Sequence, residues 1–252
     1  MLSAIGPAAV AVSGGVDSMT LATLAHRLSP GTTMFHATSP AVPPEATARV
    51  RDLAERAGWR LHVVDAGEYA DPTYRANPVN RCYYCKTNLY GTIARLTESQ
   101  ILSGANTDDL GEYRPGLDAA REHAVRHPYV EAGISKAVVR ALARDLGLGA
   151  IAELPAAPCL SSRIETGIGI EADMLASVHA AERYVTRLLK PGTVRCRVRA
   201  QGVVIELDRD SLGALDAAAR AALLESVGRM FDGRPVDIAP YKVGSAFLTD
   251  AA

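Results

Sequence analysis

Long apolar segments are missing from this sequence. A membrane-spanning helix needs about 20 consecutive apolar residues, and no apolar run among the 252 residues reaches that length. The sequence also does not open with the positively charged segment and apolar stretch that mark a secreted protein. We therefore expect a cytoplasmic protein that makes no contact with a membrane.

An excess of either charge is missing as well. The 27 lysine and arginine residues nearly balance the 28 aspartate and glutamate residues, and the formal net charge is −1. Proteins that bind nucleic acid through its phosphates usually carry a surplus of positive charge. We therefore do not expect nucleic acid as a partner, and any polyanion would need a local basic site. The hydrophobic content of 48% is enough to build a core, in one large domain or two small ones.

Cysteine is scarce, with four residues in the chain. Disulfides are rare in the cytoplasm, so we expect these cysteines to be ligands, nucleophiles or buried thiols. Cys82 and Cys85 lie at the start of a helix predicted to run to about Leu96. If that helix begins before Cys85, the two thiols share one face, a spacing that suits a single metal atom or cluster. A pair of semi-buried thiols and a redox pair are the alternatives.

The third cysteine, Cys159, follows Pro155 and Pro158, which exclude a helix and predict a loop. The nearby Arg163 would favour the thiolate form of such a cysteine. The fourth cysteine, Cys196, lies on the apolar side of a predicted strand from Thr193 to Ala200, and we expect it in the core.

The most informative stretch is a turn between a predicted strand at residues 8–12 and a predicted helix at residues 19–28. Its glycines let the backbone approach a ligand, its N–H groups have no acceptor within the helix, and its serines add hydroxyl groups. The turn has neither the spacing of the nucleoside-triphosphatase loop nor that of the dinucleotide fingerprint. A glycine-rich turn without a ligand is the alternative to an anion site formed by Ser13, Gly14, Gly15, Val16, Asp17 and Ser18.

Strands and helices alternate through the first part of the chain. Further strands are predicted at residues 33–38, 61–64 and 101–104, with a helix from about Pro44 to Gly58. This order is typical of a doubly wound parallel α/β sheet, which binds ligands at the carboxyl ends of its strands. We expect residues 1–165 to form this domain. Residues 166–252 are expected to form a smaller α+β domain, with a helix over residues 211–231 and a last strand over residues 236–243.

Polar residues follow the predicted strand at residues 101–104. Asn106, Asp108 and Asp109 can hold Mg²⁺ through carboxylate groups and water, and Arg114 can neutralise phosphate. Lys136 falls in the first turn of another predicted helix, where a cation is disfavoured unless an anion is near. These side chains are candidate ATP ligands or, alternatively, parts of solvated surface loops.

The SGGVDS turn resembles the signature of the ATP pyrophosphatases, which cleave ATP between its α and β phosphates and adenylate a substrate oxygen. That resemblance implies that adenine and ribose bind near Ser39. Over nearly the whole chain, four further segments are similar to the LarE family of ATP-dependent sulfur transferases: NPVNRCYYCK, GANTDDLGEYRPG, YVEAGISKAVVRALARDLGL and PAAPCLSSR. The LarE resemblance implies ATP and Mg²⁺ as cofactors, with Asp109 and Asp17 at the magnesium. It also implies adenylation of a carboxylate of pyridinium-3,5-biscarboxylic acid mononucleotide, followed by replacement of oxygen by sulfur.

LarE-type enzymes come in two kinds, and this sequence is similar to the kind with three cysteines. In that kind, Cys82, Cys85 and Cys159 would hold a [4Fe-4S] cluster whose open iron carries a sulfide. In the other kind, Cys159 would give up its own sulfur and become dehydroalanine. Structural zinc on the cysteines is a third alternative. The resemblance suggests a homo-oligomer and leaves the sulfur donor unknown.

The predicted C-terminal domain is expected to bind the substrate. The resemblance makes Arg163, Arg197 and Arg199 candidates for the mononucleotide, the last two for its phosphate. Gln201 and Lys242 depart from the pattern expected of the family, which leaves the identity of the substrate open. Two rival functions are a tRNA-thiolating enzyme and a non-catalytic nucleotide-binding protein with structural zinc.

Overall fold

The computed structural model describes residues 1–111 and 113–242, and they form two compact units. Unit 1 consists of Met1–Tyr74 and Asn80–Pro158. Unit 2 consists of Arg75–Val79 and the chain from Cys159 onward. The assignment of substrate binding to the C-terminal part of the chain stays a prediction. No helix among the described residues is long and apolar enough to cross a membrane.

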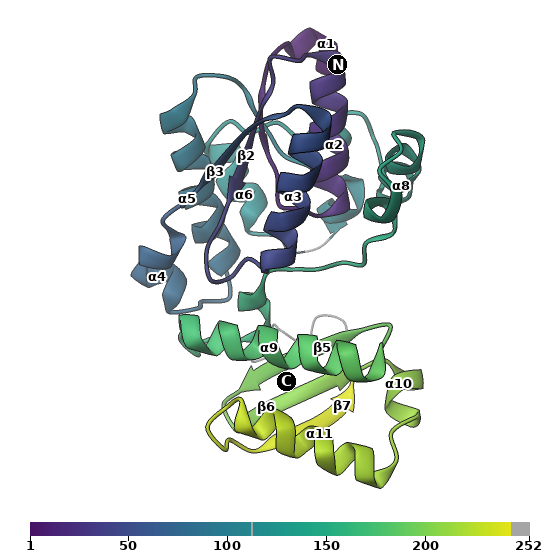
Figure 1. Ribbon diagram of the computed structural model, residues 1–252. Helices are drawn as coiled ribbons and strands as arrows, with labels where there is room; N and C mark the ends of the chain where they lie inside the picture. Colours follow the sequence, from purple (N-terminus) through teal and green to yellow (C-terminus); the bar gives the residue numbers. More distant parts are fainter. Residues whose placement is uncertain (112, 243–252) are drawn as a thin grey trace. The chain divides into compact units, whose positions relative to one another are not determined.

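Unit 1 is built on a four-stranded, entirely parallel sheet (Figure 1). Its strands are β1 (Ala9–Ala11), β2 (Thr33–Ala37), β3 (Arg60–Val64) and β4 (Ile101–Leu102), in the spatial order β3-β2-β1-β4. Ala9 lies opposite Thr33 on one side and Ile101 on the other. The central place of β1 confirms the predicted α/β fold.

Helices cover both faces of this sheet because side chains alternate along each strand. Val10 and Val12 pack with the helices at residues 16–28, 44–57 and 136–145, whereas Ala9 and Ala11 pack with the helices at residues 81–96 and 116–122. The helices of the first part of the chain are α1 (Leu2–Ile5), α2 (Val16–Leu28), α3 (Pro44–Ala57), α4 (Pro72–Arg75), α5 (Arg81–Leu96), α6 (Gly116–Glu122), α7 (Pro128–Glu131) and α8 (Lys136–Asp145). The described part of unit 1 also contains short 3₁₀ turns: η1 (Glu68–Ala70) after β3, η2 (Thr107–Gly111) after β4 and η3 (Gly149–Glu153) after α8.

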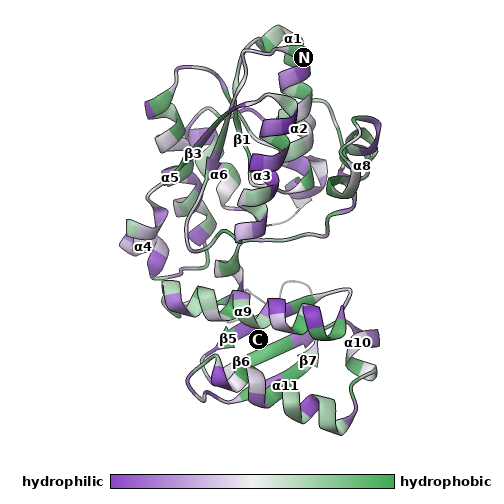
Figure 2. Ribbon diagram, viewed as in Figure 1, coloured by the Kyte–Doolittle hydropathy of each residue, from purple (hydrophilic) through white to green (hydrophobic). Residues whose placement is uncertain are grey.

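Unit 2 contains a three-stranded sheet in the order β5-β6-β7. The strand β5 (Val194–Arg199) is antiparallel to β6 (Gly202–Leu207), which is parallel to β7 (Val236–Pro240). Its helical elements are η4 (Leu160–Arg163), α9 (Ala172–Leu189), α10 (Arg209–Gly213) and α11 (Ala217–Arg229). In Figure 2, β6 is mostly hydrophobic while α9 carries both hydrophobic and hydrophilic residues, as an amphipathic helix does.

Two predicted elements of unit 2 differ from the structure. The single helix predicted over residues 211–231 is divided into α10 and α11, because the side chain of Asp216 accepts a hydrogen bond from Ala219 N and caps a new helix. Asp208 caps α10 in the same way. The last strand ends at Pro240, and the predicted end at Val243 lies outside the described residues.

A five-residue segment, Arg75–Val79, leaves unit 1 and packs within unit 2 before the chain returns. The buried Asn77 holds this segment in unit 2. Its Nδ2 donates to the carbonyl oxygens of Ile164, Glu165 and Ile168 at 3.3, 2.8 and 3.0 Å. Asn77 adopts a φ of 55°, a conformation that asparagine tolerates better than most residues. Because this segment belongs to unit 2, the chain passes from one unit to the other at residues 74–75, 79–80 and 158–159.

Candidate functional site

The SGGVDS turn lies at the carboxyl end of β1 and leads directly into α2. Because β1 lies between β2 and β4, this turn marks the point where the order of the strands reverses. Parallel α/β sheets bind ligands at such a switch point. The N-terminus of α2 also directs backbone N–H groups into this space.

The turn is tightly folded by its own serines. Ser18 Oγ accepts a hydrogen bond from Ser13 N at 3.0 Å and donates one to Gly15 O at 3.2 Å. Gly15 N donates to Ser13 Oγ at 3.4 Å, a long contact that an anion can replace. Gly14 has a φ of 85°, and a Cβ atom there would lie 2.8 Å from Ala46 O, so only glycine fits.

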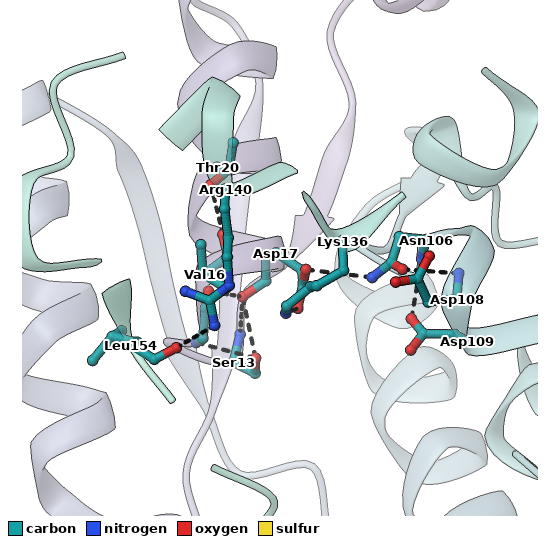
Figure 3. A network of polar contacts seen from close by, with 12 residues as sticks. Ser13, Val16, Asp17, Thr20, Asn106, Asp108, Asp109, Lys136, Arg140 and Leu154 are labelled. Atoms are coloured by element: carbon teal, nitrogen blue, oxygen red, sulfur yellow. Dashed lines mark hydrogen bonds and ion pairs between the residues drawn. The ribbon is translucent and has the colours of Figure 1, made fainter. Parts of the chain in front are cut away.

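Asp17, in the first turn of α2, contacts both Lys136 of α8 and Asn106 in the loop after β4 (Figure 3). Its Oδ2 lies 2.5 Å from the Nζ atom of Lys136, and its Oδ1 accepts a hydrogen bond from Asn106 Nδ2 at 3.4 Å. The hydroxyl of Tyr129 donates to the backbone carbonyl of Asp17 at 3.2 Å. Burial, together with the charge of Asp17, raises the pKa of Tyr129 far above its ordinary value, so this hydroxyl remains a donor at neutral pH.

The acidic loop after β4 adjoins this cluster. Asp109 Oδ2 accepts a hydrogen bond from Asn106 N at 3.0 Å, and Asp109 Oδ1 lies 2.9 Å from a guanidinium nitrogen of Arg114. Asn106 Oδ1 accepts a hydrogen bond from Asp108 N at 3.1 Å. Five side chains named from the sequence thus form one network beside the turn: Asp17, Asn106, Asp109, Arg114 and Lys136.

Each carboxylate of this network has a cation next to it. Carboxylate and amide oxygens are ligands that Mg²⁺ prefers, while lysine and arginine neutralise phosphate. The donor set therefore fits a nucleotide polyphosphate bound with Mg²⁺. Ser39, the residue predicted to lie near adenine and ribose, is two residues past the end of β2. Its Oγ accepts a hydrogen bond from Ala41 N at 3.2 Å.

A buried histidine supports the turn and was missed by the sequence analysis. Nδ1 of His36 donates to the carbonyl of Val12 at 2.7 Å, so Nε2 accepts the hydroxyl hydrogen of Thr47 at 2.9 Å. Burial lowers the pKa of His36 and keeps it neutral. A signal was present in the sequence, because a polar residue within an apolar strand must find partners.

Ser103 and His127 form a second pair that the sequence analysis did not connect. Ser103 follows β4 directly, and its Oγ lies 2.9 Å from Nδ1 of His127. Burial lowers the pKa of His127, which favours the neutral imidazole. The pair fixes the chain just before Asn106.

Cys82 and Cys85 lie in the first turns of α5, which begins at Arg81 and thus fulfils the condition for their sharing one face. Both are half-buried, and they lie at a helix N-terminus, whose partial positive charge favours an anionic group. Cys159 precedes η4 in unit 2 and is also half-buried. The four cysteines all fall within the described residues, and they form no disulfide. In the described ranges, no three His, Cys, Asp or Glu side chains are grouped to hold a metal ion.

Cys196 is fully buried in unit 2, as predicted. Burial raises the pKa of its thiol, and its backbone N donates to Glu182 Oε1 at 3.0 Å. This cysteine is part of the core of unit 2.

Two of the arginines predicted to contact the substrate, Arg163 and Arg197, are buried in unit 2. Arg163 Nε lies 2.9 Å from Glu182 Oε1, and Arg197 Nε lies 3.0 Å from Glu206 Oε2. Arg197 also donates to Ser162 O at 2.8 Å, which ties β5 to η4. Arg199 is less buried and lies 3.5 Å from Glu206. Arg163 and Arg197 therefore hold the unit together through buried ion pairs, and substrate contact by these arginines stays a prediction.

No model of a known protein family matches the sequence. The chain is 32% identical over 210 residues to the pyridinium-3,5-bisthiocarboxylic acid mononucleotide synthase of Lactiplantibacillus plantarum, a match that covers 81% of this chain and 75% of that protein. It is 40% identical to an uncharacterized protein of Synechocystis sp., over 77% of this chain and 73% of the relative. An uncharacterized protein of Methanocaldococcus jannaschii is 26% identical over 80% of this chain and 77% of its own length. The identity to the L. plantarum protein and the share of both chains that the match covers show that the chain belongs to the pyridinium-3,5-bisthiocarboxylic acid mononucleotide synthase (LarE) family.

Proposed function

We propose that the protein is an ATP-dependent sulfur transferase that converts a carboxylate of pyridinium-3,5-biscarboxylic acid mononucleotide into a thiocarboxylate, a step in making a nickel-pincer cofactor. Membership of the family supports the sulfur-transfer reaction. The observation that carries the ATP-dependent part is the network of Asp17, Asn106, Asp109 and Lys136 beside the SGGVDS turn.

The first step is adenylation. A substrate carboxylate oxygen attacks the α-phosphorus of ATP, the bond to the β-phosphate oxygen breaks, and pyrophosphate leaves. The carboxylate is ionised at neutral pH, so it needs no general base. The N–H groups of Gly14 and Gly15 and the ammonium of Lys136 stabilise the charge that develops on the leaving group. Mg²⁺, held by Asp17 and Asp109, would supply further neutralisation of the phosphates.

The second step transfers sulfur. A sulfur nucleophile attacks the carbonyl carbon of the acyl adenylate, the carbon–oxygen bond to the phosphate breaks, and AMP leaves. Cys82, Cys85 and Cys159 are the residues that would hold a [4Fe-4S] cluster. Such a cluster supplies an iron with no protein ligand, where a sulfide can bind. The half-buried positions of Cys82 and Cys85 at the start of α5 support thiolate ligation.

The alternative source of sulfur is Cys159 itself. Loss of its sulfur to the acyl adenylate would leave dehydroalanine, and each molecule would then act once. Iron content and protein mass separate the two routes. Cluster-based transfer predicts iron and acid-labile sulfide in protein purified without oxygen and an unchanged mass of Cys159 after turnover. Sacrificial transfer predicts a peptide lighter by the mass of hydrogen sulfide.

The experiment that tests the proposed function is an assay of AMP and pyrophosphate with MgATP and the pyridinium biscarboxylate mononucleotide. We expect both products to form only when the mononucleotide is present, and Asp17→Asn to suppress them. A protein that binds ATP but releases no pyrophosphate with this substrate would contradict the proposal. Products formed with tRNA in place of the mononucleotide would indicate the tRNA-thiolating alternative.

A further inference from the structure

An arginine outside the sequence motifs described above contacts the SGGVDS turn. Arg49 lies in the second turn of α3, and its Nη1 donates to the carbonyl oxygen of Gly14 at 2.6 Å. The C=O and N–H groups of one trans peptide unit point in opposite directions. By holding the carbonyl of Gly14, Arg49 therefore fixes the direction of the N–H group of Gly15.

The helix α3 is closely fitted to the turn at two further points. The carbonyl of Ala46 leaves no space for a side chain at Gly14. One residue further along, Thr47 donates to His36, which in turn donates to the carbonyl of Val12. These contacts hold α3 against Val12 and Gly14, and they place the side chain of Arg49 beside the start of the turn.

Among residues 1–111 and 113–242, no acidic side chain compensates the charge of Arg49. Its guanidinium is half-buried, yet no carboxylate in the described residues forms an ion pair with it, and it donates to the neutral carbonyl of Gly14. Burial lowers its pKa, with no acidic group to offset the effect. The other cations of the site differ in this respect, because Lys136 and Arg114 each face an aspartate.

A half-buried guanidinium without a counter-ion is costly unless an anion binds to it. Its remaining N–H groups can form paired hydrogen bonds with phosphate oxygens. We infer that Arg49 binds the β- and γ-phosphates of ATP, and hence the pyrophosphate that leaves, while it positions the N–H group of Gly15. This inference rests on the proposed function, because it adds a phosphate ligand to the same site.

The test compares the binding of inorganic pyrophosphate and of AMP, each with Mg²⁺, by titration calorimetry. Arg49→Gln is expected to weaken the binding of pyrophosphate by roughly 10- to 100-fold, the effect of losing a charged hydrogen bond, and to leave the binding of AMP within about twofold. Arg49→Lys should retain part of the affinity. Arg51→Gln removes the same charge from an exposed position of α3 and should bind pyrophosphate as the wild type does.

Equal pyrophosphate affinity of Arg49→Gln and the wild type would overturn the inference and leave the proposed function intact. An equal loss in Arg51→Gln would overturn it too, because the effect would then be one of net charge. A loss of AMP binding together with a lowered melting temperature in Arg49→Gln, with Arg49→Lys also unable to bind pyrophosphate, would make Arg49 a structural residue only. Wild-type protein that binds neither ATP nor pyrophosphate would contradict the proposed function as well.

Discussion

The ammonium of Lys136, the first residue of α8, lies 2.5 Å from the carboxylate of Asp17 in the first turn of α2. A cation at a helix N-terminus opposes the helix dipole, whereas an anion there is favoured. The pairing removes the conflict for Lys136 and holds the two helices together at the turn. The pair also keeps the ammonium of Lys136 at a position where a phosphate can replace the carboxylate of Asp17 as its partner.

Removing this cation should affect catalysis far more than stability. The side chains of Lys136 and Asp17 are 32% and 28% exposed, so the pair contributes about 1 kcal/mol or less to folding. We expect Lys136→Met to lower the rate of pyrophosphate release roughly 100-fold. Arg144→Met is the matched control, since Arg144 lies on the same helix in an exposed pair with Glu153. A similar rate loss in both variants would contradict a specific role for Lys136.

The cysteines should divide into two classes by their effect on iron. Cys82→Ala removes a proposed ligand and should abolish the iron content and visible absorption of protein purified without oxygen. Cys196→Ala alters a buried core thiol and should keep the iron at the cost of about 1 kcal/mol of stability. Elemental analysis of both variants is the measurement. Retention of iron in Cys82→Ala would contradict its role as a ligand.

The buried ion pair of unit 2 should be essential for stability. Arg197 and Glu206 are each 6% exposed, so Glu206→Gln leaves an uncompensated guanidinium in the core. We expect a loss of about 3–5 kcal/mol in the free energy of unfolding, measured in urea. Glu225→Gln breaks an exposed pair with Arg229 on α11 and should cost less than about 1 kcal/mol. An equal loss of unfolding free energy in both variants would contradict the prediction that the buried pair stabilises the protein more than the exposed pair does.

Stability should fall in mild acid because of His36. Burial lowers the pKa of this side chain below its ordinary value of 6.5, so the unfolded chain binds a proton at a higher pH than the native protein. Its contribution is complete above that ordinary pKa and is lost as the pH falls below it. His127 and His179, whose pKa values are also lowered, add to this loss. Unfolding free energies measured from about pH 7.5 to about pH 5.5 should therefore decline less in His36→Gln than in the wild type. Parallel pH profiles would exclude His36 as a source of the decline.

The sequence was sufficient for the frame of unit 1 and for the network around Asp17. Predicted strands that alternate with predicted helices indicate a parallel sheet. The carboxyl ends of its strands bring Asp17, Asn106 and Asp109 together. Cys82 and Cys85 were expected on one helix face if the helix began before Cys85, and α5 begins at Arg81, which meets this condition.

The contacts that were not predicted from the sequence join residues that are far apart in the chain. Arg163 of η4 pairs with Glu182 of α9, and Arg197 of β5 donates to Ser162 O of η4. Local sequence patterns do not reveal such partners. The roles of His36 and Arg49 depend on the packing of α3 against the turn, which local periodicity does not reveal. The break between α10 and α11 was readable in principle, since Asp216 is a good capping residue after Gly213.

The excursion of Arg75–Val79 into unit 2 limits how this protein can be recombined. A fragment ending at Pro158 would keep Asn77 but lose the carbonyl groups of residues 164, 165 and 168 that it contacts. Neither unit can therefore be exchanged for that of another protein by a single cut in the gene. Any shuffling of these units during evolution, or in the laboratory, has to carry the five-residue segment along with the C-terminal part of the chain.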